Sequence, residues 1–211
     1  MSKYIKAGVF CLLLMAIMVF LGCGKPEVKP LEKPSEPAQK LFLKSQKELA
    51  ADSYEQAYAD YQKAVATDSR VADISHLSSI LYSWAISETE SEDMPLLDAQ
   101  RKVWLEPNQL SLRQGLMKVA VDSERGVIYA FGLGVASENR PHVDQRRQLA
   151  RQAAMADAKA WVARIARWGR DGIKCPFDIS LAVVGAETLK EYWIGDAVYV
   201  IKFRAPVDCL E

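Results

Sequence analysis

The sequence predicts an α+β protein, in which an N-terminal helical hairpin or three-helix unit precedes an antiparallel sheet covered by one long helix. Three observations lead to this fold class. Apolar and small residues recur at helical spacing through residues 38–86, with no proline among them. The same spacing continues through residues 143–168. Short runs rich in β-branched and aromatic residues, 127–135 and 188–203, lie on either side of that second helical segment.

The N-terminal residues resemble a bacterial lipoprotein signal peptide. A short basic start precedes an apolar run, 7–20, which is shorter than the roughly 20 residues that span a bilayer as a helix. Leu21-Gly22-Cys23 follows and is similar to the lipobox of bacterial lipoproteins. The resemblance implies that residues 1–22 are removed and that Cys23 is acylated. An uncleaved membrane anchor with an incidental cysteine is the alternative.

Residues 23–37 are predicted to be the lipidated cysteine and a tether rich in proline and lysine. Lysine-proline pairs recur every four residues in this segment. Because proline fixes φ and lacks an amide donor, we expect an extended chain of about 40 Å, at ~3.1 Å per residue, rather than helix or sheet. By resemblance to lipoprotein sorting signals, Gly24 after the cysteine favours the outer membrane, with the folded part in the periplasm.

Residues 38–86 are predicted to form a helical module that resembles a tetratricopeptide repeat. Ala57, Tyr61 and Ala64 occupy the places where the second helix of that repeat has small, aromatic and small residues, and Ser45 stands in the place of its glycine. The segment holds roughly one and a half repeats, whereas about three are needed for a free-standing array. We therefore expect the module to pack on the rest of the chain, with its aromatic stripe in the core. A peptide groove is the alternative for that stripe.

Residues 87–100 are predicted to be an acidic linker. The sequence SETESED has no apolar periodicity, and Pro95 follows it. Its carboxylates lack the alternating ligand positions and the glycine of an EF-hand loop. We therefore expect a solvated segment rather than a calcium site.

The remaining residues, 101–211, are predicted to form an α/β domain. Residues 117–121 and 127–135 are expected to pair as a hairpin across the turn-forming sequence DSERG. A long helix follows at 143–168, where a stripe of alanines would let it lie close to a sheet. Glycines at 169 and 172 are expected to end it.

Two further strand segments are predicted after the long helix, at 179–184 and 188–203. Within the second, Gly195-Asp196 is typical of a two-residue type II′ turn, which would pair Tyr192 with Tyr199. One set of side chains would then share the face that meets the alanine stripe: Tyr192, Ile194, Tyr199, Ile201 and Phe203.

Residues 118–206 resemble the envelope lipoproteins of the Lpp-twenty type. The shared pattern is a strand ending in Gly-x-Gly-x-Ala-Ser at residues 132–137, an alanine-rich helix with Asp157-Ala158, and a late hairpin that holds Trp193 and Tyr199. The resemblance implies an envelope-facing α/β domain without known catalysis. It supplies no ligand.

Charge and motif content exclude several classes of function. Two of the 27 basic residues lie within residues 1–22, so the rest of the chain, with 27 acidic residues, has a net charge of −2 and no electrostatic reason to bind nucleic acid. The sequence has no dinucleotide loop, P-loop or nucleophile elbow, and neither His76 nor His142 has a second ligand at metal spacing. We therefore expect no cofactor, no metal and no catalytic residue.

Arginines cluster on the long helix with aspartates between them. This mixture predicts a solvated face, with a site for an acidic partner as the alternative. The residues are Arg146, Arg147, Arg151, Arg164, Arg167 and Arg170, with Asp144, Asp157 and Asp171.

Cys175 and Cys209 are the cysteines that remain after Cys11 and Cys23 are assigned to the signal and the anchor. An exported compartment permits a disulfide between them. The bridge would span a separation of 34 residues and would stabilise the fold by ~3 to 4 kcal/mol on the chain-entropy model. Two free thiols are the alternative.

Together these features predict a non-catalytic envelope lipoprotein that presents a helical and an α/β module to an envelope protein or to the cell wall. An enzyme that acts on wall or envelope polymers is the alternative. An apolar or basic groove between the two modules would favour binding. Converging carboxylates, or a cysteine-histidine pair in a pocket, would favour the enzyme.

Overall fold

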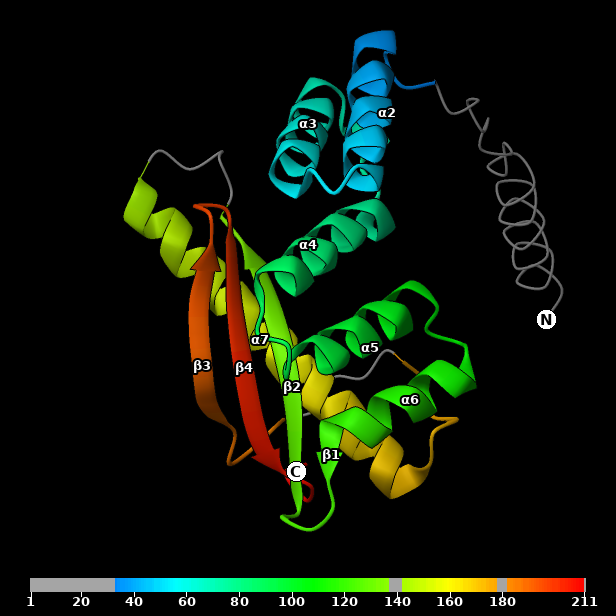
Figure 1. Ribbon diagram of the computed structural model, residues 1–211, viewed down its shortest axis with the longest axis vertical. Coiled ribbons are helices and arrows are strands. Elements are labelled where there is room, and N and C mark those ends of the chain that lie inside the picture. Colours follow the sequence, from blue (N-terminus) through cyan, green and yellow to red (C-terminus); the bar gives the residue numbers. More distant parts are fainter. Residues whose placement is uncertain (1–32, 137–141, 178–181, 211) are drawn as a thin grey trace, which may run out of the picture. The chain divides into compact units, whose positions relative to one another are not determined.

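The N-terminal part of the fold consists of helices α2 (Glu36–Ala50), α3 (Tyr54–Thr67) and α4 (Ile74–Glu88), with the 3₁₀ turn η1 (Ser69–Val71) before α4. The helical prediction for this part of the chain is confirmed. Helices α2 and α3 lie side by side as a hairpin (Figure 1). Asp52, in the turn between them, has a φ of 55°.

The structure, a computed structural model, describes residues 33–136, 142–177 and 182–210. The expected signal peptide, Cys23 and most of the expected tether lie outside the described residues. The end of the tether prediction is wrong, because α2 already begins at Glu36 with a proline in its first turn, where a missing amide proton costs no hydrogen bond. The described residues from Pro34 onward belong to one compact unit, in which the helices pack on the sheet.

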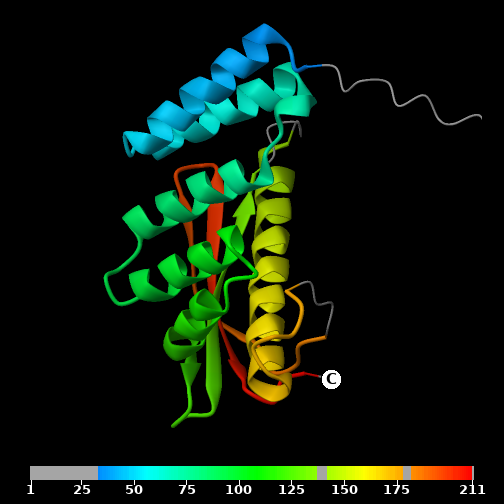
Figure 2. The ribbon, with the colours of Figure 1, turned by 90° about the vertical axis from the view of Figure 1, so that its right-hand side faces the viewer.

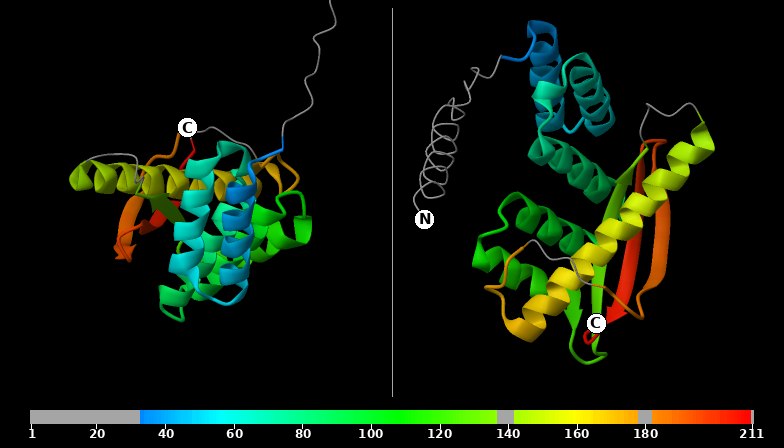
Figure 3. Two further views of the ribbon diagram at one scale, coloured as in Figure 1. Left: turned by 90° about the horizontal axis from the view of Figure 1, so that it is seen from above. Right: turned by 180° about the vertical axis from the view of Figure 1, so that it is seen from behind.

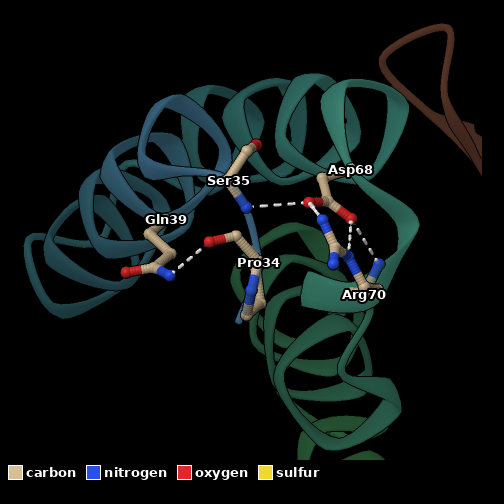
Figure 4. A network of polar contacts seen from close by, with 5 residues as sticks. All are labelled: Pro34, Ser35, Gln39, Asp68 and Arg70. Atoms are coloured by element: carbon tan, nitrogen blue, oxygen red, sulfur yellow. Dashed lines mark hydrogen bonds and ion pairs between the residues drawn. The ribbon is translucent and has the colours of Figure 1, made fainter. Parts of the chain in front are cut away.

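Asp68 fastens the beginning of α2 to the end of α3 (Figure 4). Its carboxylate accepts the amide proton of Ser35 at 2.8 Å and the guanidinium of Arg70 at 2.7 and 2.9 Å. Beside it, Gln39 Nε2 donates to the carbonyl of Pro34 at 2.6 Å. Arg70, and then the Ser35 amide, hold the pKa of Asp68 well below its ordinary value.

Ser45 joins α2, α3 and α4. Its buried Oγ donates to the carbonyl of Ala57 at 2.7 Å and lies 3.0 Å from His76 Nε2. Since the hydroxyl has one proton, the imidazole Nε2–H must be the donor in the second contact. The His76 ring also packs against Phe42 and Tyr61. Ser45 therefore binds three helices together.

Two further helices, α5 (Met94–Leu105) and α6 (Leu110–Ala120), lead into the sheet. Both differ from prediction. Helix α5 begins inside the segment expected as a linker, 87–100, because Leu96 and Leu97 are buried against the rest of the fold. Residues 117–120, expected as strand, are the last turn of α6, and only the two residues of β1 follow it.

The sheet confirms the α+β fold class. Its four antiparallel strands run in the order β1-β2-β4-β3. The hairpin predicted across DSERG is present, with Val121 opposite Ile128. The strands are β1 (Val121–Asp122), β2 (Val127–Val135), β3 (Glu187–Ile194) and β4 (Val198–Pro206).

The register of the β3–β4 hairpin differs from prediction by one residue. Ile194 pairs with Val198, so the loop has three residues rather than two, and Trp193 rather than Tyr192 lies opposite Tyr199. Because side chains alternate between the faces of a sheet, this shift exchanges the faces of residues 190–194. An irregularity between Thr188 and Lys190 restores the predicted register at Glu187 and Thr188. Tyr192 and Ile194 therefore do not share a face with Tyr199 as expected.

The strand predicted at 179–184 is not formed in its described part. Residues 178–181 lie outside the described residues, and Val183 makes one isolated bridge, to Leu210.

Helix α7 (Val143–Asp171) crosses one face of the sheet, as the view from behind in Figure 3 shows. The prediction of close packing is confirmed, because a Cβ at Gly132 would lie 2.0 Å from Ala154 O and one at Gly134 would lie 1.9 Å from Ala150 O. Gly169 lies within the helix, contrary to expectation. Gly172, at φ 98°, follows its end.

The other face of the sheet is also covered, by α4 and α5, which adds a layer to the predicted architecture (Figure 2). These helices also meet α7 beyond the edge of β2, where Trp161 Nε1 donates to the Tyr82 hydroxyl at 2.9 Å. A buried core of aromatic and aliphatic side chains joins all three layers.

Candidate functional site

A groove lies where α3 and α4 meet the beginning of α7, between the predicted helical and α/β modules. It consists of two pockets, of about 340 and 710 Å³, that share Glu55, Ala59 and Trp84. We call it the α3–α7 groove. Its further lining residues on the α7 side are Ala136, Val143, Arg146, Arg147, Asp196 and Ala197. Those on the α3–α4 side are Asp52, Ser53, Tyr54, Gln56, Tyr58, Ser87 and Glu88.

The floor of the groove is aromatic. Trp84 and Tyr58 are 6% and 4% exposed, and their ring centroids are 6.3 Å apart. The prediction that the aromatic stripe of this helical module belongs to the core is confirmed for Tyr61, and Tyr58, which was not assigned to that stripe, is buried as well. Tyr58 also lines the groove, so this side chain belongs both to the core and to the groove.

One wall of the groove is basic. Arg147 forms an ion pair with Asp196 at 3.1 Å and lies over the ring of Trp193, with 5.7 Å from Cζ to the centroid. Arg146 is half-buried and forms no ion pair with any residue in the described ranges. A half-buried guanidinium beside aromatic rings can bind a carboxylate with little competition from water.

The opposite wall is acidic. Glu55, Glu88 and Asp52 line it, and the Tyr54 hydroxyl donates to Asp52 at 2.7 Å, which raises the pKa of Tyr54. The groove therefore offers an aromatic floor between opposite charges. This arrangement suits a ligand that carries separated charges around an apolar group.

The prediction of a solvated arginine face on α7 is confirmed for Arg147, Arg151 and Arg170, which are exposed. It is wrong for Arg164 and for the interleaved Asp157. Arg164 is 9% exposed, and its Cζ lies 4.4 Å from the centroid of Phe177 and 5.1 Å from that of Trp161. Asp157 turns to the sheet and accepts the amide proton of Leu133 at 3.1 Å. Both differences arise because α7 is covered on more than one side, which a single apolar stripe does not reveal.

The two histidines do not form a site with other candidate residues. Ser45 and His76 are not arranged as a catalytic nucleophile and its base, because the Ser45 hydroxyl donates its proton to the carbonyl of Ala57 rather than to the imidazole. Burial lowers the pKa of His76. His142 is exposed at the beginning of α7.

Cys175 and Cys209 are both free thiols in the structure. Cys209 is buried, and burial raises the pKa of its thiol, whereas Cys175 is half-buried. The disulfide between them stays a prediction, to be tested by thiol labelling.

Glu90, Glu92 and Asp93 bring three carboxylates within 4.8 Å of one another at the beginning of α5. Lysines already occupy this cluster: Lys190 pairs with Glu90 at 2.8 Å, and Lys202 pairs with the buried Asp93. These ammonium groups take the positions that a cation would need.

Comparisons with protein-family models, curated proteins and solved structures found no match to this chain. Among the described helices, none has both the length and the hydropathy to cross a bilayer.

Proposed function

We propose that this protein is a non-catalytic envelope lipoprotein, anchored through acylated Cys23, whose α3–α7 groove binds an extended segment of another envelope protein. The observation that carries the binding proposal is the half-buried Arg146 next to the Trp84–Tyr58 floor. The anchoring proposal rests on the signal-like N-terminus. The protein does not depend on bound cofactors in this proposal.

Charge complementarity defines the segment that fits. A carboxylate of the partner would pair with Arg146, an apolar side chain would cover Trp84, and a basic group would face Glu55 or Glu88. Buried aromatic and arginine side chains are the residue types that dominate binding energy in protein interfaces. The predicted location of this surface is the periplasmic side of the outer membrane.

The anchor is tested with Cys23→Ala. We expect the variant to keep its precursor mass and to take up no fatty-acid probe. If it is processed and labelled like the wild type, the anchor is disproved.

The groove is tested by site-specific photocrosslinking in cells, with p-benzoylphenylalanine at Ala59 and, as a control, at the exposed Lys159 of α7. We expect a crosslinked protein at position 59 only. The identified partner is then purified, and its affinity is measured for Arg146→Glu and for the matched control Lys159→Glu. A loss of tenfold or more for Arg146→Glu alone supports the groove, and equal affinities for both variants reject it.

The same wild-type and variant proteins test two other functions, namely binding to the cell wall and catalysis on it. Purified peptidoglycan sacculi are incubated with the wild-type protein and centrifuged. If the protein sediments with the sacculi and Arg146→Glu sediments less, the ligand of the groove is the cell wall rather than a protein. Release of soluble wall fragments by the wild type would replace binding with catalysis.

A further inference from the structure

A second pocket, separate from the α3–α7 groove, lies at the free edge of β2 and encloses about 130 Å³. We call it the Asp157 pocket. Four elements build it: Ser78, Leu81 and Tyr82 come from α4, Trp104 from α5, Leu133 from β2 and Asp157 from α7.

The pocket is mainly apolar with one carboxylate. Asp157 accepts one hydrogen bond, from the Leu133 amide at 3.1 Å, and it forms no ion pair with any residue in the described part of the chain. Burial raises the pKa of Asp157 to about 6, although the charge of Arg164 acts in the opposite direction. At neutral pH the pocket therefore holds a carboxylate whose ionisation is disfavoured by burial and supported by the Leu133 amide and by the charge of Arg164.

The walls favour a cation as the missing partner. Trp104 and Tyr82 line the pocket with aromatic rings, a residue type that attracts cations, and Leu81 and Leu133 add apolar surface. The guanidinium of Arg164 already lies over the Trp104 ring, with 5.8 Å from Cζ to the centroid. Tyr82 is 4% exposed and accepts a hydrogen bond from Trp161. The phenolic oxygen can also accept a hydrogen bond from a ligand ammonium group.

Size limits the ligand further. A cavity of about 150 Å³ accommodates a benzene-sized molecule. A pocket of about 130 Å³ therefore fits a short alkyl chain with one charged head group, and it excludes a sugar ring with its substituents.

We infer that the Asp157 pocket binds a protonated primary amine, whose ammonium group pairs with Asp157 and whose alkyl part lies against Trp104 and Leu133. The amine is either a free small molecule or a lysine side chain of another protein, and both present the same chemistry. This inference does not depend on the function proposed for the α3–α7 groove.

The Leu133 amide provides a direct reporter, because its proton is bonded to Asp157. Backbone amide spectra of the protein are recorded during titration with n-butylammonium and, separately, with the neutral analogue n-butanol. We expect a saturable shift at Leu133 with butylammonium alone. Because the ligand needs the ionised carboxylate, affinity should be about tenfold weaker at pH 5 than at pH 7.5.

Asp157→Asn keeps an acceptor for the Leu133 amide but removes the charge, so it should reduce butylammonium affinity at least tenfold. The control Asp144→Asn, at the exposed beginning of α7, should have no effect. If Asp157→Asn does not fold, Trp104→Leu should weaken binding about two- to fivefold. Equal shifts with butanol, or no saturable shift in the wild type, would overturn the inference.

A second titration distinguishes the two sources of the amine. Nα-acetyl-lysine methylamide carries the same head group on a peptide backbone. Binding of this probe as strong as that of butylammonium assigns the pocket to a lysine of a partner protein. Binding of butylammonium alone assigns it to a free amine.

Discussion

The side chain of Gln100 on α5 forms two hydrogen bonds with the main chain of Phe131 on β2: Nε2 donates to the carbonyl at 2.9 Å, and Oε1 accepts the amide proton at 2.8 Å. In this way the glutamine occupies the edge of β2 as a neighbouring strand would. Asp157 continues the same edge at Leu133. An exposed strand edge is a template for aggregation, and here two helices close it.

Gln100→Ala should therefore destabilise the protein by about 2–4 kcal/mol, because it leaves a buried donor and a buried acceptor of Phe131 unpaired. Chemical denaturation measures the loss, and hydrogen exchange should show faster exchange at the Phe131 amide. Lys102→Ala, an exposed change on the same helix, is the control and should cost less than about 1 kcal/mol. Similar losses for both variants would contradict the role of Gln100.

Gly134→Ala should cost at least about 3 kcal/mol, because the added methyl group would meet the backbone of α7 at Ala150 and neither element can shift freely. Gly115→Ala is the matched control. It lies in α6 with no atom within 4 Å of the added methyl group, so it should stabilise the helix by about 0.5–1 kcal/mol. Thermal unfolding of both variants should show shifts in opposite directions.

Asp157→Asn should stabilise the protein at pH 7.5 and not at pH 4. The pKa of Asp157 is about 6 in the folded state, above the ordinary 3.8, so its favourable contribution exists at low pH and is lost as pH rises through 6. The gain at pH 7.5 should be at most about 3 kcal/mol and smaller where solvent reaches the carboxylate. A gain of equal size at both pH values would show that the charge is not its cause.

His76 should make the protein less stable as pH falls below 6.5. Burial lowers the folded-state pKa of His76 below 6.5, so the unfolded chain binds more protons in that range and is favoured there. Between pH 7.5 and pH 5.5, the free energy of unfolding should fall less, or rise more, in His76→Gln than in the wild type, because Asp157 adds the opposite dependence to both proteins. His142→Gln, at an exposed position, should keep the wild-type dependence.

Thiol alkylation distinguishes two free thiols from a disulfide between Cys175 and Cys209. With free thiols, as in the structure, native protein should label faster at the half-buried Cys175 than at the buried Cys209, and unfolded protein should label at both before reduction. Mass spectrometry of the oxidised, unfolded chain reads the result. Labelling of neither cysteine before reduction would establish the bridge predicted from the sequence.

The sequence allowed good prediction of long periodic elements. The 127–135 strand has the predicted limits, and the long helix begins where expected, because many residues repeat one pattern in each. The short run at 117–121 was predicted as strand, but five apolar-rich residues fit the end of a helix equally well. Gly195 can begin a two- or a three-residue loop, and that ambiguity is enough to shift the hairpin register.

The sites were harder to predict than the elements. Asp157 looked like part of a solvated face because aspartate on a charged helix usually is, and only the position of β2 shows that it is turned inward. Gln100 carried no local signal, and Arg146 was one of six clustered arginines for which a site for an acidic partner was only the alternative. Their roles arise from contacts between elements far apart in the chain, for which spacing along one helix holds no information.

The hydrogen bonds from Ser35 and Arg70 to Asp68 determine how the fold would respond to a force that pulls on its N-terminal end. Tension applied at Pro34 would load these bonds in parallel with the first turn of α2, so the helix would resist peeling until the carboxylate released its partners. With Asp68→Ala, the same tension would act on α2 alone, and its turns would open one after another at lower force. The bonds to Asp68 would therefore keep the α2–α3 hairpin closed when the chain is pulled at its N-terminus while another surface of the protein is held in place.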